Sequence, residues 1–488
     1  MSKFAQWFRE TTPYINTHRG KTFVVSLCGA ALEHTNLINI VHDLALLKTL
    51  GVKLAIVHGA RPQLDAVLPA PAHASALRIT TEADLAPLRQ TMGELRAQLE
   101  ARFAASLPGS PLHNAHINLI GGNFVIAQPV GIVDGIDYQF TGRVRSIRTE
   151  SMQAQLDLGT VVVLSPVGYS RSGQLYNIAA EDLAAEVAIA LSADKLITFA
   201  ADPYICSGNG TPLPELTPNE LDDLLDELPE SHGDRRRLQA MLKACRHSIP
   251  RCQQVSYQDD GALLTELFTA DGQGSQLAQA PYRNVRTATA ADLPQIIALI
   301  RPLEQQGMLV RRSRVTLERE INQFLVAEVD NQIIGCCALH EHSDSLAQDP
   351  DKEQSTLMEL ACFATRTPST ATNLAEPLRS SEELTDASDG RNGKSARDRT
   401  ASKDGKAPVR ASIGEQLLAA AERTCLQRGV QQLFVLTTLT QDWFLEHGFT
   451  ALDIAQLPAS KRAEYDHKRK SQAYVKRIGT RGSRTQSG

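Results

Sequence analysis

The sequence predicts an α/β protein in two parts: a three-layer domain with a mainly parallel sheet, followed by a smaller α+β domain. The chain has 488 residues, which is too long for one hydrophobic core of usual size. In the first half, strand-like apolar runs alternate with helical patterns, as in parallel sheets that carry helices on both faces. From about residue 286 the pattern changes to closely spaced strands mixed with helices, which indicates a second domain.

The first strand–helix–strand unit is the clearest of the first half. Residues 22–28 form a strand-like run that ends at Gly29, and apolar residues then recur at helical spacing from Leu37 to Leu47. A second strand follows at 53–57, so the two strands should be parallel and joined by a right-handed crossover. Further units of this kind are predicted from strand 160–166, helix 181–192, strand 195–200, helix 234–246 and strand 252–257.

The second domain is predicted to begin with a helix, and Asp292 and Pro294 mark its N-terminus. Two strands, at about 323–329 and 332–339, should meet in a tight hairpin turn at Asp330-Asn331. The remaining elements are predicted as strand 356–363, helix 413–428 and strand 431–437. Mixed strands and helices in this order predict an α+β domain.

Composition argues against several kinds of protein. Hydrophobic residues make up 42% of the chain and charged residues 22%, as in ordinary soluble proteins, and a net charge of −5 argues against a nucleic-acid partner. The eight cysteines include no Cys-x-x-Cys pair, so neither a disulfide framework nor a metal site is expected. The N-terminal MSKFAQWFRE has no signal-peptide core, and no apolar stretch approaches the ~18 residues of a membrane span. We therefore expect a soluble, cytoplasmic protein with no membrane partner.

The most informative feature is a carboxylate on an apolar strand, followed far downstream by a glycine-led helix start. The strand contains Glu359 within MELAC, and the helix start reads ASIGEQLL around Gly414. A base on a strand that faces the exposed amides of a helix suits acyl transfer from a phosphate-bearing carrier. Together with LFVLTT at 433–438 and WFLEHGF at 443–449, these segments resemble the GCN5-related N-acetyltransferases.

Acetyl transfer to an amine requires a base, a polarised thioester carbonyl and a stabilised leaving thiolate. Glu359 is the candidate base, and Cys362 should lie near the thioester without acting as a nucleophile, because nothing in the sequence indicates an activated thiol. Thr437 is the first candidate to serve the leaving sulfur, and Thr438 is the second. Taken one by one, Cys362 would be a small buried residue and the threonines would be strand formers.

The same chemistry also needs groups that hold acetyl-CoA. Main-chain N–H groups after the cysteine would bind the thioester carbonyl oxygen, and amides at the helix start would bind the pyrophosphate. The candidate carrier-binding residues are therefore Cys362, Phe363, Ala364, Arg410, Gly414 and Glu415. Trp443 and Phe444 are interpreted as core residues rather than as contacts of the carrier.

In the first half, the segments VVSLCGAALE, VHGARPQLD, LYNIAAEDLAAEVA and ALLTELFTADGQGS resemble the amino-acid kinase fold. Family kinases carry a lysine in the first strand, where this chain has Ser26. Their second glycine-rich loop is replaced by Ala60-Arg61, and Glu181 stands where the family usually has aspartate, although Lys243 remains. Without the lysine and the open loops most of the electrostatic stabilisation of phosphoryl transfer is lost, so an active acetylglutamate kinase is the least favoured function.

A kinase-like fold that has lost its catalytic groups can persist as a sensor. The run LTELFTADG at 264–272 resembles the segment that binds free arginine in arginine-regulated acetylglutamate kinases. The matching carboxylate is Glu266, with Gly272 and Gly274 in the loop, and a carboxylate with loop carbonyls suits a guanidinium. The alternative is that Glu266 is a solvated helix residue.

Two candidate guanidinium clamps, Arg311 and Arg469, lie far apart in the sequence. A dicarboxylic amino acid needs such cations, because bidentate contacts fix its carboxylates while the amine stays free. Taken alone, both runs would be solvated surface charge. Nearly the whole chain resembles the bacterial N-acetylglutamate synthases, through PYINTHRGKTFV, VHGARPQ, HINLIGGNFVIAQP, YQDDGALLTELF, LIRPLEQQGMLVRRSR, QQLFVLTT and RKS.

That resemblance implies acetyl transfer from acetyl-CoA to L-glutamate, the first step of arginine biosynthesis, with no metal. Arg311, Arg469 and Ser471 match the residues that hold glutamate, and Glu359 matches the base. It also implies feedback inhibition by L-arginine and ring-shaped homo-oligomers. On this basis we expect a degenerate, arginine-sensing kinase-like domain at 1–280 and an acetyltransferase domain at 283–480.

One segment departs from the family. Residues 366–409 are rich in Ser, Thr, Asp, Lys and Arg, have almost no aliphatic runs, and are expected to form a disordered insertion beside the carrier site. Family members carry an arginine five residues before the helix glycine, where this chain has Val409, so that Arg410 comes one step late. A catalytically impaired, arginine-binding regulator is therefore the alternative function.

Overall fold

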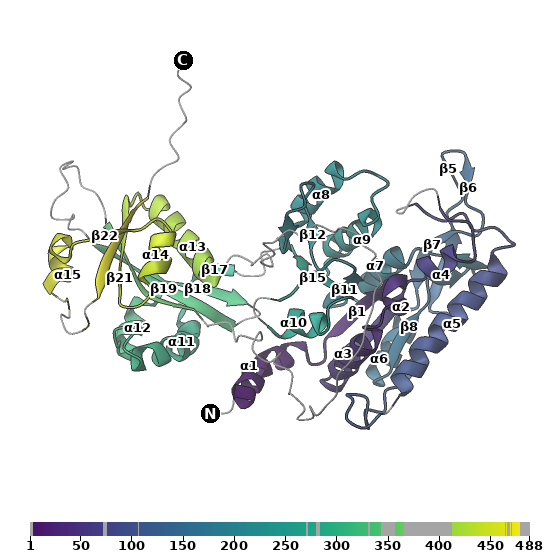
Figure 1. Cartoon of the computed structure of the whole chain (residues 1–488), viewed down its shortest axis with the longest axis horizontal. Helices are drawn as coiled ribbons and strands as arrows, with labels where there is room; N and C mark the ends of the chain where they lie inside the picture. The colour runs from purple at the N-terminus through teal and green to yellow at the C-terminus, as the bar shows by residue number, and fades with distance from the viewer. Residues whose placement is uncertain are drawn as a thin grey trace, which may run out of the picture.

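The protein is described here by a computed structural model that covers residues 3–71, 76–105, 107–269, 272–279, 284–329, 332–342, 357–365, 412–463, 465, 469 and 471–478. Two large sheets dominate it, and Figure 1 shows them in separate halves of the molecule. The boundary expected near residue 281, the turn Asp330-Asn331, Arg410 and the insertion 366–409 all lie outside the described residues.

The first sheet has eight strands in the order β14-β16-β15-β11-β1-β2-β8-β3. All neighbouring pairs are parallel except β15 and β16. Its strands are β1 (Thr22–Leu27), β2 (Lys53–His58), β3 (Leu119–Ile120), β8 (Val161–Leu164), β11 (Lys195–Ala200), β14 (Glu215–Leu216), β15 (Arg251–Ser256) and β16 (Ser275–Leu277).

Helices cover both faces of this sheet. Along β1 the side chains alternate between two cores: Val24 packs with helices on one face, and Phe23 and Val25 pack with helices on the other. This alternation follows from the two-residue period of a strand and confirms the three-layer prediction. The helices are α1 (Lys3–His18), α2 (Gly29–Glu33), α3 (Leu37–Thr49), α4 (Arg61–Asp65), α5 (Leu85–Ala104), α6 (Thr149–Asp157), α7 (Ala180–Ala190), α8 (Pro218–Glu227), α9 (Arg235–Arg246) and α10 (Ala262–Phe268).

A smaller four-stranded sheet, which the sequence did not indicate, lies within the first half in the order β10-β9-β4-β7. Its strands are β4 (Val125–Pro129), β7 (Gly142–Ile147), β9 (Val167–Tyr169) and β10 (Leu175–Asn177). Two short hairpins complete this half: β5 (Ile132–Val133) with β6 (Ile136–Asp137), and β12 (Ile205–Cys206) with β13 (Pro212–Leu213).

The second large sheet has seven strands in the order β17-β18-β19-β20-β21-β23-β22, and only the β20–β21 pair is parallel. Its strands are β17 (Asn284–Thr287), β18 (Phe324–Val329), β19 (Gln332–His342), β20 (Leu357–Thr365), β21 (Gln432–Thr437), β22 (Thr450–Leu452) and β23 (Gln472–Arg477). This mixed sheet confirms the predicted α+β character of the second domain.

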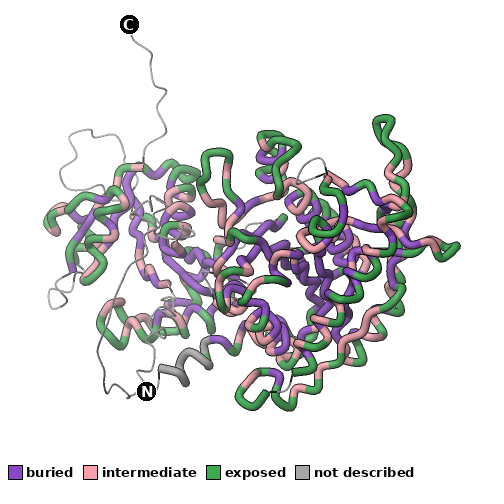
Figure 2. Tube along the Cα trace, turned by 45° about the vertical axis from the view of Figure 1, so that its right-hand side comes forward, coloured by how far each residue is buried: buried purple, intermediate pink, exposed green. Residues whose placement is uncertain are grey.

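Helices α11 and α12 pack on one face of the second sheet, and α13 and α14 pack on the other. These helices are α11 (Leu293–Gln305), α12 (Arg314–Glu320), α13 (Ile413–Gln427) and α14 (Gln441–Glu446), and a short helix α15 (Ala459–Ala463) precedes β23. Figure 2 shows that the buried residues run through the interior of both halves. In the described part of the chain, no helix combines the length and the apolar character that a membrane crossing requires.

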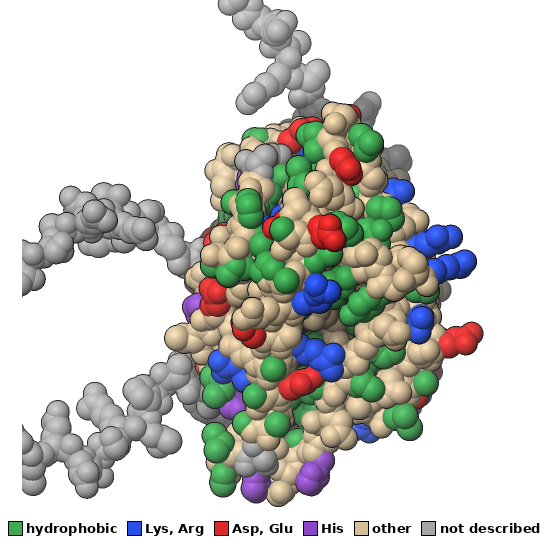
Figure 3. Space-filling model, turned by 90° about the vertical axis from the view of Figure 1, so that its right-hand side faces the viewer, with side chains coloured by type: hydrophobic (Ala, Val, Ile, Leu, Met, Phe, Trp, Pro, Cys, Tyr) green, Lys and Arg blue, Asp and Glu red, His purple; other side chains and the backbone are tan. Residues whose placement is uncertain are grey.

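Surface charge on the end of the first domain is mixed. Figure 3 shows Lys and Arg side chains interspersed with Asp and Glu side chains on this face. Interspersed charges of both signs are typical of an ordinary solvated surface, whereas a nucleic-acid site would carry a cluster of positively charged side chains.

Candidate active site

A cleft opens where β20 and β21 stop pairing. The two strands pair in parallel up to Leu360 opposite Val435, and both strands then continue beyond that point. A cavity of about 480 Å³ lies at this opening. Its lining contains the predicted carrier-binding residues Cys362, Phe363, Ala364 and Gly414 and both candidate threonines, Thr437 and Thr438.

A bulge in β20 shapes one wall of the cleft. Ala338 of β19 pairs with Ala361, but Cys336, two residues earlier, pairs with Ala364, so β20 contains one extra residue. Cys362 lies in this bulge and has a φ of +48°. A bulge of this kind disrupts the ladder locally and bends the strand, which re-aims main-chain groups beside a site.

The Cys362 thiol is poorly suited to nucleophilic attack. Burial raises the pKa of this thiol, and the nearby cation Arg312 lowers the pKa by a smaller amount, so the pKa is about 11. At neutral pH the group is therefore a thiol rather than a thiolate, and a thiol is the weaker nucleophile.

The N-terminus of α13 forms a second wall. The Ser412 hydroxyl accepts from the Glu415 amide at 3.1 Å, and the Glu415 carboxylate accepts from the Ser412 amide at 2.6 Å, which makes a capping box. The same carboxylate lies 3.5 Å from His447. The Glu415 carboxylate thus accepts a hydrogen bond from a main-chain N–H group at the start of α13. The sequence predicted that Glu415 would contact the carrier instead.

Trp443 closes this end of the cleft. A Cβ at Gly414 would lie 3.0 Å from the Trp443 ring, so the glycine allows the indole to pack against the first turn of α13. The indole stacks on His447 at a ring separation of 4.1 Å. Trp443 and Phe444 both line the cavity as well as packing with the core, a double role that sequence reasoning missed because it assigned aromatic residues to the core alone.

Glu359 is a buried carboxylate with two partners. It is 4% exposed, its Oε1 lies 2.9 Å from the ammonium of Lys461 on α15, and its Oε2 accepts from His342 Nε2 at 3.3 Å. Burial raises the pKa of Glu359, but the hydrogen bond from His342 and the positive charge of Lys461 lower it by more, and the net pKa is below its usual value. The carboxylate is therefore ionised at neutral pH, as a base must be.

Neither partner was found from the sequence. His342 lies one strand away and Lys461 is 102 positions from Glu359 by number (461 − 359), within a charged run that resembles ordinary surface sequence. Across the sheet, Glu359 is directly opposite His340 on β19. Burial, followed by the charge of Arg312, lowers the pKa of His340, so this ring is neutral beside the carboxylate.

Both arginines that were predicted to hold glutamate are associated with the loop between α11 and α12. Arg469 Nη2 donates to the main-chain oxygens of Gly307 and Met308 at 3.3 and 2.9 Å, and this loop continues into Arg311. Met308 lines the cleft, so Arg469 lies beside it. Ser471 is buried, and its main-chain oxygen accepts from the Tyr465 hydroxyl at 2.6 Å.

Arg311 itself is exposed and lines a second cavity, of about 750 Å³. The lining of this basin is strongly basic and consists of Arg301, Glu304, Gln305, Arg311, Arg312, Ser313 and Arg314. The 480 Å³ cleft and this basin share no lining residue, so the structure places Arg469 against Met308 of the cleft wall and Arg311 in a separate cavity.

The predicted sensor residues gather at one place in the first domain. Glu266 is 5% exposed, and its two oxygens accept from Gln253 Nε2 at 2.7 Å and from the Gln273 amide at 2.8 Å. Gln273 stands between Gly272 and Gly274, and a Cβ at Gly274 would lie 2.1 Å from the main-chain oxygen of Gln254. The alternative of a solvated Glu266 is therefore wrong.

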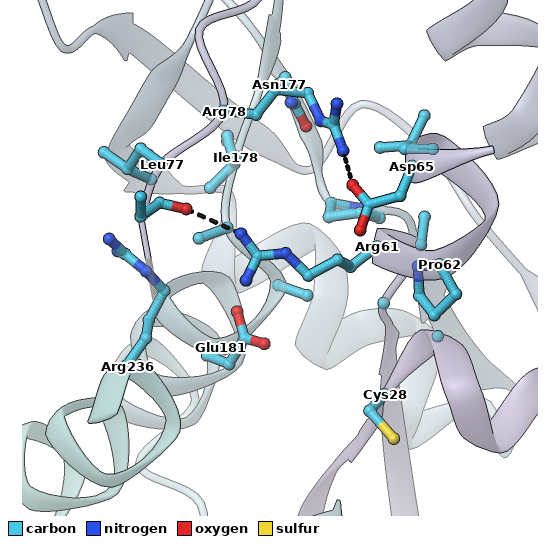
Figure 4. Close-up of a pocket in the computed structure, with 18 of the residues that line it drawn as sticks. Cys28, Arg61, Pro62, Asp65, Leu77, Arg78, Asn177, Ile178, Glu181 and Arg236 are labelled. Carbon is cyan, nitrogen blue, oxygen red and sulfur yellow. Dashed lines mark hydrogen bonds and ion pairs between the residues drawn. The ribbon is translucent and has the colours of Figure 1, made fainter. Parts of the chain in front are cut away.

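A cavity of about 460 Å³ lies at the loops that resemble kinase glycine loops. Figure 4 shows the residues that line this cavity. The Arg61 side chain extends across it and donates to the main-chain oxygen of Ala76 at 2.8 Å. A Cβ at Gly29 would lie 2.6 Å from Pro62, so this loop packs against α4 instead of leaving its backbone open to phosphate. Lys243 pairs with Glu186 at 2.5 Å, and this arrangement argues against phosphoryl transfer.

Comparison with known proteins agrees with this architecture. Residues 21–252 match the amino acid kinase family. The chain is 41% identical over 482 residues to the amino-acid acetyltransferase of Azotobacter vinelandii, covering 98% of this chain and 100% of that one. The chain belongs to the amino-acid acetyltransferase family. The amino-acid acetyltransferase of Escherichia coli K12 is 39% identical over 486 residues, covering 98% of this chain and 99% of that protein.

Solved structures extend the match to the three-dimensional fold of the chain. N-acetylglutamate synthase from Neisseria gonorrhoeae, complexed with coenzyme A and L-arginine, superposes with a TM-score of 0.70 at 31% identity, covering 98% of this chain and 100% of that one. The same enzyme complexed with coenzyme A and N-acetyl-glutamate gives a TM-score of 0.56 over the same coverage. The chain is thus an acyltransferase enzyme that joins a kinase-like fold to a second domain built on a mixed sheet.

Proposed function

We propose that this chain transfers the acetyl group of acetyl-CoA to the α-amine of L-glutamate, which gives N-acetyl-L-glutamate and CoA, and that L-arginine inhibits the reaction. The observation that carries the proposal is the buried, ionised Glu359 beside the opening between β20 and β21. The solved relatives with coenzyme A, L-arginine and N-acetyl-glutamate support the choice of ligands, because each covers nearly this whole chain.

In the proposed reaction Glu359 accepts a proton from the glutamate ammonium, directly or through a water. The free amine attacks the thioester carbon, and the main-chain N–H groups of Phe363 and Ala364 stabilise the oxyanion. The CoA sulfur leaves with a proton supplied through the Thr437 hydroxyl, which already hydrogen-bonds Thr440 at 2.7 Å, or alternatively through Thr438. Thr437 is favoured because this contact fixes its hydroxyl at the cleft.

Glutamate is proposed to bind with its carboxylates on Arg469 and Arg311, assisted by Ser471. Arg469 already donates to the loop between α11 and α12, and the same loop carries Arg311. The CoA pyrophosphate is assigned to the start of α13 around Gly414, with Arg410 and Glu415 as flanking residues. We assign arginine binding to Glu266, Gly272 and Gly274, because a buried carboxylate suits a guanidinium.

We further propose that 1–280 forms the arginine-sensing domain and 283–480 the acetyltransferase domain, with 366–409 as an insertion. The eight cysteines are free thiols, which supports a reducing, cytoplasmic location. The homo-oligomer that the resemblance implies stays a prediction, and light scattering on the purified chain tests it.

The test is a CoA-release assay with acetyl-CoA and L-glutamate, with and without L-arginine. We expect CoA release with glutamate, little release with L-glutamine, and a lower rate when arginine is added. A matched deletion of residues 368–406 shows whether the insertion affects the KM of acetyl-CoA. If no amino acid supports CoA release, the proposal is wrong.

The second candidate function is a non-catalytic arginine-binding regulator. It is favoured by the Glu415 carboxylate, which accepts the Ser412 amide at the helix start where a pyrophosphate would bind. This candidate predicts arginine binding by calorimetry together with no CoA release from any amino acid.

A further inference from the structure

Lys461 lies against the carboxylate that the proposed mechanism uses as a base. Its ammonium is 2.9 Å from Glu359 Oε1, and its side chain is 18% exposed. It comes from α15, a short helix that lies between β22 and β23 in the sequence. The fold thus holds a primary amine, in its ammonium form, within hydrogen-bonding distance of a buried base.

This amine lies within reach of the proposed base, which is one requirement for an acetyl acceptor. A general base removes a proton only from a group within hydrogen-bond reach or one water away. The amine of glutamate must therefore come to the Glu359 carboxylate, whose Oε2 is taken by His342 and whose Oε1 is taken by Lys461. The residue after Glu359, Leu360, already lines the cleft.

We propose that Lys461 is itself an acetyl acceptor, so that the enzyme acetylates its own Lys461 when no amino acid occupies the acceptor site. This inference rests on the proposed function, because it uses the same base and the same acetyl-CoA. The Lys461 ammonium gives one proton to Glu359, and the amine nitrogen that results bonds to the thioester carbonyl carbon. The carbon–sulfur bond breaks, the second proton of this nitrogen passes to the leaving sulfur, and the products are Nε-acetyl-lysine and CoA.

Lys476 provides a matched comparison in the same domain. It also pairs with a carboxylate, Glu422, at 2.5 Å, and its side chain is 26% exposed. Its partner is on α13, whereas Glu359 directly precedes Leu360, a residue of the cleft lining. Uncatalysed acetylation by acetyl-CoA depends on access to solvent and should favour Lys476, whereas catalysed transfer should favour Lys461.

The experiment incubates the full-length chain with acetyl-CoA and no amino acid, and follows acetylation of each lysine by peptide mass spectrometry. Lys461 should be acetylated about 100-fold faster than Lys476, the order of gain that a general base supplies. Glu359→Gln should reduce the rate at Lys461 to that at Lys476. N-acetyl-L-glutamate should protect Lys461, because it occupies the acceptor site without consuming acetyl-CoA, and Lys461→Arg should remove the modified peptide.

A parallel assay of CoA release with L-glutamate separates the two claims. If glutamate is acetylated but Lys461 reacts no faster than Lys476, the inference is wrong and the proposed function stands. If Lys461 is acetylated and glutamate is not, the inference stands and the proposed acceptor is wrong. If neither reacts, both are wrong.

Discussion

Arg469 donates a 2.9 Å hydrogen bond to the main-chain oxygen of Met308, a residue 161 positions earlier in the chain. Through this contact, the segment before β23 holds the loop that contributes Met308 to the cleft and Arg311 to the basic basin. The same cation is the one that we propose binds a carboxylate of the acceptor.

We predict that Arg469→Ala raises the KM of L-glutamate about tenfold or more, with a smaller effect on the KM of acetyl-CoA. A hydrogen bond from a charged group contributes about 1.5–3 kcal/mol, and here both the loop contact and the substrate contact are lost. Steady-state kinetics measure both constants. Arg477→Ala, at an exposed position on β23, is the control and should leave both unchanged. An unaltered KM of glutamate in Arg469→Ala would remove this residue from the acceptor site.

Glu359→Gln should lower kcat about 100-fold or more, the usual contribution of a general base. Because the hydrogen bond from His342 and the charge of Lys461 hold the pKa of Glu359 below its usual value, the wild-type rate should not fall through protonation of this group until the pH is below the ordinary range of a glutamate carboxyl group. The pH profile of kcat/KM measures this acid limb. Glu341→Gln, at an exposed neighbour on β19, should retain the wild-type rate. Full activity in Glu359→Gln would mean that solvent deprotonates the amine.

Cys362→Ala should keep kcat within about threefold of wild type, because a thiol with a pKa of about 11 is not the nucleophile. Cys362→Val should lower the free energy of unfolding by about 1–3 kcal/mol, since a β-branched side chain is strained at a φ of +48°. Urea denaturation measures the difference. Loss of activity in a folded Cys362→Ala protein would show that the thiol takes part in catalysis.

Glu266→Gln should raise the arginine concentration for half-inhibition about tenfold, because the carboxylate that would pair with the guanidinium loses its charge. Inhibition curves of CoA release measure this shift. Glu227→Gln, on the exposed side of α8, serves as the control and should leave the curve where it is. An unshifted curve for Glu266→Gln would place arginine elsewhere.

Asp43→Asn should stabilise the protein at about pH 8 and have little effect near pH 4. Burial, and then the charge of Asp260, raises the pKa of Asp43 to about 7. The folded state thus holds this proton more tightly than the unfolded state, so the wild type loses stability as the pH rises from about 4 to about 7. Thermal unfolding at both pH values checks the sign, and a Tm difference that is the same at both would contradict it.

Much of the fold could be predicted from local patterns. Each predicted strand and helix is found, with ends that differ by a few residues, because a period of two or 3.6 depends on neighbours in the chain. The small sheet of β4, β7, β9 and β10 was missed, since its strands are short and only partly buried. Glu359, Cys362 and Thr437 could be proposed from the sequence because they stand within recognisable strands, and their roles stay predictions.

The sequence by itself determined the two-part α/β architecture, the family resemblance and several residues of the cleft, because motif and periodicity are local properties. Only the tertiary structure decided which charges meet: Lys461 and His342 at Glu359, Arg469 at the loop before Arg311, and the capping role of Glu415. The physical reason is that the energy of an ion pair depends on a separation of a few ångströms between the two charges. When these charges come from segments far apart in the chain, the local spacing of residues does not show which of them will come together.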